Sequence, residues 1–166
     1  MENTHEFDSS LESFKSLLKN SGIHDALGFL SRRTPHRYTG VYKFDGETLR
    51  NLALYDGYDP KIIKGEDAPM ATTYCSLVQT KQKLEINDAQ NDKRVKDIII
   101  TPVVSYCGVL IRDAAGNPFG TLCHFDMKRC QETFLDFPLL EEAAKFLFKY
   151  LENEIAAAPD RGTQTK

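Results

Sequence analysis

The sequence lacks a long apolar run, an excess of positive charge and an apolar signal segment at its start. Its longest apolar stretches fall far short of the roughly 20 residues that a membrane-spanning helix needs. The formal net charge is −3, from 21 Lys and Arg against 24 Asp and Glu, so we expect no binding to nucleic acid or to a membrane surface. Because residues 1–8 are acidic and polar, we expect a cytoplasmic protein.

Several motifs of catalysis and metal binding are also missing. There is no glycine-rich phosphate loop, no His-Glu-x-x-His and no Gly-x-Ser-x-Gly. None of the four cysteines forms a Cys-x-x-Cys pair, and Cys123-His124 with Cys130 has poor spacing for a metal, so we expect no metal site. In the cytoplasm the cysteines are expected to be thiols rather than structural disulfides.

The length of 166 residues and an ordinary composition, 41% hydrophobic and 27% charged, predict one globular domain over residues 1–158. Within it, residues 1–7 are expected to be a disordered tail, and residues 8–34 to form two N-terminal helices. The polar residues 159–166 are expected to form a second disordered tail.

The segment 104–126 is the centre of the predicted fold. Residues 104–112 and 119–125 are apolar or β-branched, and the turn residues 114–117 separate them, which predicts a hairpin. Both strands carry apolar residues at consecutive positions rather than only at alternate ones. Such strands are covered on both faces, so we place this hairpin in the middle of a sheet.

The remaining segments predict an α+β fold with strands joined by hairpins and helices at both ends of the chain. Apolar spacing predicts helices over 8–19 and 23–32, the second ending before Thr34-Pro35. The Asp45-Gly46 turn predicts a second hairpin. The other predicted elements are strands 38–44 and 47–55, a long loop 56–69, a short helix 70–80, a strand 84–86 and a helix 137–156. Residues 98–100 are apolar but end at Thr101-Pro102, so their structure is left ambiguous.

The last predicted helix, 137–156, carries two apolar stripes side by side. A helix that packs on one surface needs only one such stripe. The second stripe therefore predicts another contact, which we interpret as a second subunit in a homodimer. The two stripes consist of Leu139, Ala143, Phe146 and Tyr150, and of Leu140, Ala144, Leu147 and Leu151.

Four segments, taken in order, resemble the GAF domain, a small-molecule sensory fold. Residues 39–46 resemble its opening hairpin, and residues 73–78 are similar to a helix that often carries a cysteine. Residues 84–94 resemble its strand that ends in an Asp-Ala turn. Residues 105–126 resemble its closing signature, and the whole resemblance covers somewhat over half of the chain.

This resemblance implies a central antiparallel sheet of five to six strands, with the terminal helices packed on one face and a ligand pocket on the other. In the family those helices often pair subunits, and the domain is usually joined to an output domain. This chain has no room for one, so a sensor of this kind would act through dimer rearrangement or a separate output protein. The ligand and any cofactor are left unknown.

The candidate ligand-binding residues are thiols, tyrosines and a few polar side chains near the matching motifs. A free thiol beside a pocket can sense oxidants, attack a substrate or bind a chromophore, but cysteine is also an ordinary small core residue. Likewise, a tyrosine can line a pocket or belong to the core. The candidates are Tyr74, Cys75, Asp92, Arg94, Tyr106, Cys107, Cys123 and His124.

The leading hypothesis is a small-molecule-binding sensory domain without catalytic activity. A second hypothesis is a thiol-dependent enzyme similar to the stand-alone GAF proteins that reduce free methionine-R-sulfoxide, with Cys75 and Cys123 as its catalytic pair. The resemblance places Cys75 where that subfamily has one of its cysteines. The subfamily's other two have no counterpart, because neither 56–69 nor 87–102 contains a cysteine. A third hypothesis is a dimerisation scaffold with no ligand.

Overall fold

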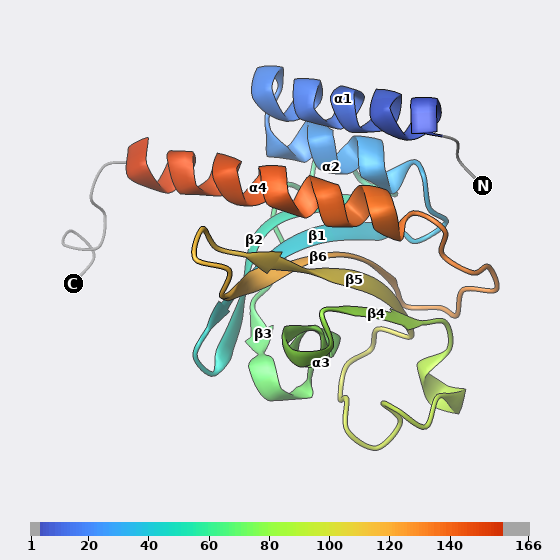
Figure 1. The fold of residues 1–166 in the computed structure, drawn as a ribbon. Helices are drawn as coiled ribbons and strands as arrows, with labels where there is room; N and C mark the ends of the chain where they lie inside the picture. The colour runs from blue at the N-terminus through green and yellow to red at the C-terminus, as the bar shows by residue number, and fades with distance from the viewer. Residues whose placement is uncertain (1–3, 158–166) are drawn as a thin grey trace.

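The computed structural model describes residues 4–157, which form one six-stranded antiparallel sheet with helices on both faces (Figure 1). The strand order is β3-β2-β1-β6-β5-β4. The predicted α+β class is therefore confirmed, and so is the central position of the 104–126 hairpin, because β5 and β6 are interior strands. In chain order the elements are α1 (Thr4–Asn20), α2 (Ile23–Ser31), β1 (Tyr38–Asp45), β2 (Thr48–Asp56), β3 (Ala68–Pro69), η1 (Met70–Thr72), α3 (Tyr74–Lys81), β4 (Lys83–Ile86), η2 (Ala89–Asn91), β5 (Ser105–Arg112), β6 (Pro118–Asp126) and α4 (Phe137–Ala157).

The helices divide between the two faces of the sheet. Helices α1, α2 and α4 lie on one face, which we call the helix face, while α3 lies on the other, which we call the loop face (Figure 1). Helix α4 packs on β5, and α2 packs on β1 and β2. The sheet is thus the middle layer of the domain. Within residues 4–157, no helix combines the length and the apolar character that crossing a bilayer requires.

Each central strand sends alternate side chains into two separate cores. Cys107 and Leu122 belong to the core of the helix face, whereas Tyr106, Cys123 and Phe125 belong to the core of the loop face. Side chains in a strand alternate between faces with a period of two. Burial on both sides is therefore the reason that apolar residues occupy consecutive positions in β5 and β6, as the sequence predicted.

The β1–β2 hairpin is confirmed, and its turn has the expected geometry. Gly46 has a φ of +65°, a conformation that favours glycine, which explains the Asp45-Gly46 signal. By contrast, residues 98–100 belong to neither a helix nor a strand, and Ile98 and Ile100 are exposed. The run of three isoleucines that was ambiguous in the sequence therefore lies in a loop.

The first helix begins earlier than predicted. Helix α1 starts at Thr4, so the expected disordered tail over 1–7 is wrong for residues 4–7, while residues 1–3 lie outside the described part. The physical reason is Phe7, which packs against the helix-face core together with Leu11 and Phe14. The apolar stripe thus extends one turn further toward the N-terminus. The predicted tail over 159–166 lies outside the described residues.

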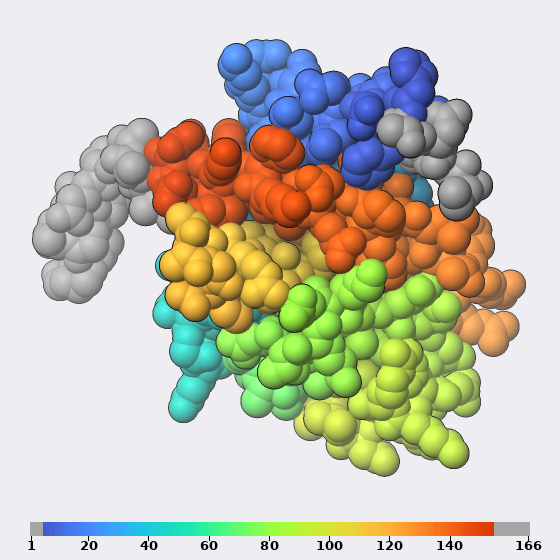
Figure 2. Space-filling model, in the orientation of Figure 1, coloured from blue at the N-terminus to red at the C-terminus, as the bar shows by residue number. Residues whose placement is uncertain are grey.

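Both apolar stripes of α4 are accounted for within the chain itself. One side of α4 packs on β5 and the other side packs on α1, as Figures 1 and 2 show. Leu139 and Leu140, one from each stripe, are 1% and 0% exposed. The second contact that the stripes indicated is therefore made by helix α1 of the same chain. A homodimer through this helix loses that support and stays a prediction.

Two histidines are buried at one end of the helix face. His124 is 0% exposed, its Nδ1 lies 2.7 Å from Thr39 Oγ1, and its Nε2 has no hydrogen-bond partner among the described residues. The His36 ring is stacked on it, with 6.1 Å between the ring centroids. Burial, with a smaller contribution from His36, lowers the pKa of His124 to about 3, and burial also lowers the pKa of His36. Both rings are therefore neutral in the folded protein at neutral pH.

Acid should destabilise the fold through these histidines. Because the pKa of His124 is lower in the folded than in the unfolded chain, the unfolded chain binds the extra proton between pH 6.5 and about 3. The free energy of unfolding should fall by up to about 1.4 kcal/mol per pH unit for this one group as pH decreases through that window. Urea unfolding at several pH values measures this slope.

The variant His124→Asn removes the titrating ring and keeps a polar group beside Thr39. Its unfolding free energy should depend less steeply on pH than that of the wild type, even if the variant is less stable overall. An unchanged slope would show that His124 is not the group responsible.

Candidate functional site

A cavity of about 100 Å³ lies on the loop face of the sheet, and we call it the tyrosine–cysteine cavity. Strands of the sheet form its floor, and its walls come from helix α3, the 57–67 loop between β2 and β3, and the 92–104 loop before β5. Exposed Glu66 and half-buried Thr101 belong to its lining, so the cavity reaches solvent. The lining residues are Tyr42, Leu49, Glu66, Ala68, Thr73, Tyr74, Cys75, Thr101, Val103, Tyr106, Cys123 and Phe125.

The first turn of α3 brings Tyr74 and Cys75 to the cavity. The Tyr74 hydroxyl donates a hydrogen bond to the Val103 carbonyl at 2.6 Å, and its ring stacks on Tyr106 with 5.0 Å between centroids. The polar tip of Tyr74 is therefore satisfied while its ring faces the cavity. Cys75 is 3% exposed and lies beside the helix N-terminus, where the helix dipole favours a thiolate.

Cys123 lies at the middle of the floor, between two glycines. Gly40 of β1 is its partner on one side and Gly108 of β5 on the other. A Cβ atom on Gly108 would stand 2.4 Å from the Tyr106 hydroxyl, and one on Gly40 would stand 2.8 Å from the Tyr42 ring. The two tyrosine rings therefore lie over the two glycines. They therefore flank the position of Cys123 in the sheet on its two sides.

The hydroxyl groups around Cys75 form a hydrogen-bonding cluster. Cys75 Sγ lies 3.1 Å from Thr121 Oγ1 and 3.3 Å from the Tyr106 hydroxyl. The Cys123 thiol donates to the Gly40 carbonyl at 3.7 Å. A thiol has a single proton, so Cys123 can donate to Gly40 or toward Cys75, but not to both at once.

These neighbours separate the acidities of the two thiols. Burial by itself would raise the pKa of Cys75, but hydrogen bonds from Cys123, Thr121 and Tyr106 outweigh it, and the pKa falls below its ordinary value. Burial and the adjacent Cys75 raise the pKa of Cys123, and burial together with the two neighbouring cysteines raises the pKa of Tyr106. Cys75 is therefore the more acidic of the two thiols, and its neighbours are hydrogen-bond donors to it.

The structure brings together four of the predicted site residues, Tyr74, Cys75, Tyr106 and Cys123, and separates the other four from them. Cys107 and His124 are cross-strand partners on the helix face, where Cys107 Sγ lies 4.0 Å from His36 Nε2. Burial raises the pKa of Cys107 well above its ordinary value. Neither residue can line a cavity on the opposite face of the sheet.

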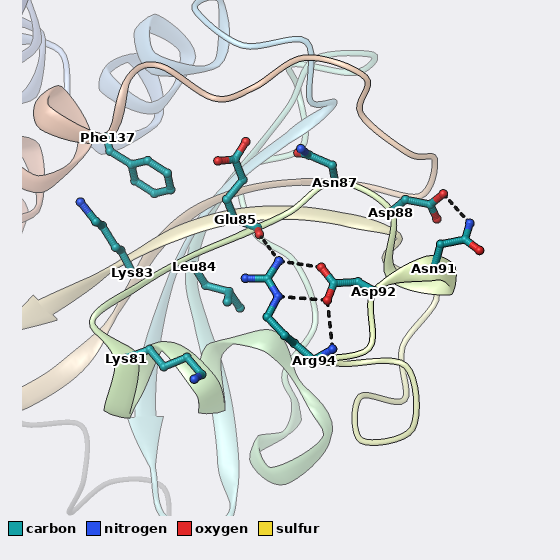
Figure 3. A pocket seen from close by; sticks show the side chains of 10 residues that line it. All are labelled: Lys81, Lys83, Leu84, Glu85, Asn87, Asp88, Asn91, Asp92, Arg94 and Phe137. Atoms are coloured by element: carbon teal, nitrogen blue, oxygen red, sulfur yellow. Dashed lines mark hydrogen bonds and ion pairs between the residues drawn. The ribbon is translucent and has the colours of Figure 1, made fainter.

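Asp92 and Arg94 line a different hollow, an open groove of about 630 Å³ beside β4 (Figure 3). The two side chains bind each other, with 2.6 Å between Arg94 Nη2 and Asp92 Oδ2, and Arg94 also donates to the Glu85 carbonyl. Their hydrogen-bonding groups are thus used to hold the 92–94 turn against β4. This pairing fits a structural role.

Other cavity residues were not predicted from the sequence. Thr121 shares the face of Cys123 because it precedes it by two positions in a strand, so the period of two could have found it. Glu66, Ala68 and Thr101 come from loops or a two-residue strand, and only the folded chain brings them together. Over residues 4–157, no three His, Cys, Asp or Glu side chains are grouped closely enough to hold a metal ion.

We predict that Tyr106→Phe and Gly108→Ala will both raise the pKa of Cys75. The first removes the hydroxyl that lies 3.3 Å from the sulfur, and the second pushes that hydroxyl away with a new Cβ. Because a hydrogen bond to the thiolate is lost, the alkylation profile of Cys75 should shift toward higher pH. The pH dependence of Cys75 alkylation, followed by peptide mass spectrometry, measures it.

Tyr58→Phe is the matched control, because Tyr58 is 67% exposed on the 57–67 loop and does not line the cavity. It should leave the alkylation profile of Cys75 unchanged. A Tyr106→Phe profile identical to that of the wild type would refute the proposed contribution of the tyrosine.

The comparisons with solved structures find close similarity of fold at low sequence identity. Free methionine-R-sulfoxide reductase from Neisseria meningitidis superimposes with a TM-score of 0.70 and 16% identity, over 95% of each chain. The GAF domain of the Acinetobacter phosphoenolpyruvate-protein phosphotransferase gives a TM-score of 0.70 and 14% identity, over 96% of this chain and 99% of that one. The type II free methionine-R-sulfoxide reductase from Thermoplasma acidophilum gives 0.60 and 16%, over 87% and 96%.

No protein-family model matches the sequence, and neither does any curated protein sequence. At these identities the structural likeness shows the fold and not the activity. Among the similar structures, the same fold occurs in GAF domains and in free methionine-R-sulfoxide reductases. This chain therefore has a GAF-like fold.

Proposed function

We propose that this chain is a sensory domain that binds a small molecule in the tyrosine–cysteine cavity. The observation that carries the proposal is the position of the cavity, on the face of the sheet opposite the packed helices and under the loops. Aromatic side chains with a few convergent polar groups are typical of ligand sites. Tyr42, Tyr74 and Tyr106 supply the aromatic lining here.

The lining also indicates what kind of ligand fits. Its volume of about 100 Å³ is well below the roughly 300 to 1,000 Å³ of pockets for drug-sized molecules. Among the described residues of the lining, Glu66 has the one carboxylate, and there is no Lys, Arg or His. A ligand with its own carboxylate would find no cation there. The proposed ligand is therefore small and either neutral or cationic.

How ligand binding would be transmitted is part of the same proposal. A second copy of the chain or a separate output protein would respond to the ligand. The apolar side chains of α4 face β5 and α1. Its outer side carries the exposed residues Glu141, Lys145 and Lys149 and is therefore charged. We therefore place the response on another surface rather than on the outer side of this helix.

A pair of matched substitutions tests the ligand site. Ala68→Leu adds a larger side chain to the cavity lining, whereas Ala115→Leu makes the same change on the exposed turn between β5 and β6. Native mass spectrometry should show a retained small molecule on the wild type and on Ala115→Leu, and not on Ala68→Leu. Thermal shifts with propylammonium and with propionate as probes should favour the cation.

Two outcomes would contradict the sensory proposal. One is an empty wild-type protein whose thermal unfolding responds to neither probe. The other is equal retention of a small molecule by both leucine variants, because the ligand would then lie somewhere other than the tyrosine–cysteine cavity.

The second candidate function is a thiol-dependent sulfoxide reductase, and the observation that favours it is the presence of Cys75 and Cys123 in one cavity. The Cys75 thiolate would attack the sulfoxide sulfur, the oxygen would pass to Cys75 as a sulfenic acid, and a thioether would be released. The Cys123 thiol would then form a disulfide with release of water. We place this function second because free methionine sulfoxide carries a carboxylate that the lining does not match.

A coupled assay with free methionine-R-sulfoxide and a dithiol reductant tests the second candidate. If it is correct, Cys75→Ser should lower the turnover at least roughly a hundredfold, because the nucleophile is removed. The control Cys130→Ser removes the partly exposed cysteine outside the cavity and should retain turnover within about twofold. Wild-type turnover no faster than that of the reductant alone would exclude this function.

A further inference from the structure

The thiol cluster of the tyrosine–cysteine cavity has features that neither ligand binding nor the size of the cavity explains. Cys75 is held by two hydroxyl groups, from Thr121 and Tyr106, at 3.1 and 3.3 Å. Thr121 is 0% exposed and Tyr106 is 3% exposed, so these hydroxyls are withdrawn from bulk water. An acidic thiol with two buried proton donors is a reactive arrangement rather than an inert core cysteine.

We propose that Cys75 and Cys123 react with small hydroperoxides and are converted to a disulfide. Hydrogen peroxide and short alkyl hydroperoxides are neutral and have few heavy atoms, which suits a cavity of about 100 Å³ without a cationic side chain in its lining. The inference uses the same cavity as the proposed function, but it requires neither a sensory ligand nor an output partner.

In the first step the Cys75 thiolate attacks the terminal oxygen of the hydroperoxide. A sulfur–oxygen bond forms, the oxygen–oxygen bond breaks, and the alcohol or water leaves. Sulfur is oxidised by two electrons to a sulfenic acid and the peroxide is reduced by the same two electrons. The leaving oxygen needs a proton, and the hydroxyls of Tyr106 and Thr121 are placed at the sulfur to relay one from water that enters the cavity at Glu66 and Thr101.

In the second step the Cys123 thiol attacks the Cys75 sulfenic acid, and water is released as the disulfide forms. Cys123 is suited to this step because it is 0% exposed, lines the same cavity as Cys75 and shares a strand face with Thr121, whose hydroxyl lies 3.1 Å from Cys75 Sγ. The new bond would tie helix α3 to the middle of β6. A dithiol reductant would break it and restore both thiols.

The other two cysteines serve as internal comparisons. Cys107 lies on the helix face and is 0% exposed, so peroxide in the cavity cannot reach it. Cys130 is partly exposed, and its thiol is hydrogen-bonded to the Glu132 carbonyl outside the cavity. Within the part of the chain that the structure describes, neither of them has a pair of hydroxyl donors at its sulfur as Cys75 has. We therefore expect selectivity for Cys75 over both.

The test is to treat the reduced full-length protein with hydrogen peroxide at neutral pH. Intact mass should fall by the mass of two hydrogen atoms, and peptide mapping should find Cys75 joined to Cys123. Oxidation should be about tenfold faster than that of N-acetylcysteine, because more of the thiol is ionised while its intrinsic nucleophilicity is slightly lower. Dithiothreitol should return the original mass.

The variant Cys123→Ser should stop at the sulfenic acid, which dimedone then labels on Cys75. Cys130→Ser should behave like the wild type, and Tyr106→Phe should slow the oxidation. Circular dichroism and thermal unfolding establish that each variant is folded before its rate is compared. Dimedone labelling at Cys107 or Cys130 instead of Cys75 would overturn the proposal, and so would a rate equal to that of N-acetylcysteine.

The same experiment separates this inference from the proposed functions. Suppose that the disulfide forms in a protein that retains no small molecule and whose thermal unfolding responds to neither propylammonium nor propionate. This result would support the peroxide reaction and contradict the sensory role. Disulfide formation with methionine-R-sulfoxide at a rate equal to that with peroxide would assign the pair to the reductase function instead.

Discussion

Burial of the central hairpin on both faces is the constraint on which the rest of this structure depends. Strands β5 and β6 need an apolar cover above and below, since their consecutive apolar residues alternate between the two faces. Three helices cover one face, and α3 with the loops covers the other. The cover by helices is a continuous packed core, whereas the cover by loops leaves the tyrosine–cysteine cavity.

The alternation also decides which cysteine can do chemistry. Cys107 and Cys123 lie on neighbouring strands, but cross-strand pairing places Cys107 opposite His124 and Cys123 opposite Gly108. Cross-strand partners share a face, so the two thiols are buried on opposite sides of the sheet. One packs near His36 under the helices, and the other forms the floor of the cavity beside Cys75.

Glycine has a specific structural function in the cavity. Gly40 and Gly108 flank Cys123 in the sheet, and the rings of Tyr42 and Tyr106 occupy the space that two Cβ atoms would take. The absence of two side chains thus permits two aromatic rings to lie close to the sheet. This arrangement brings the Tyr106 hydroxyl to Cys75 and links the backbone of the floor to the acidity of a thiol on a helix.

The sequence by itself determined the helices, the two hairpins and the central place of the 104–126 segment, because these depend on local periodicity and turn residues. It also identified Tyr74, Cys75, Tyr106 and Cys123 as site candidates. It could not show that Cys75 and Cys123 share a cavity, since α3 and β6 meet only through long-range packing.

The same limit explains the misassigned residues. Cys107 and His124 are close in sequence to cavity residues but lie on the opposite face of the sheet, and one of the two apolar stripes of α4 packs on α1, which lies more than a hundred residues away in the chain. The tertiary structure alone decided these contacts, because a sequence pattern records that a surface is apolar but not which distant surface covers it.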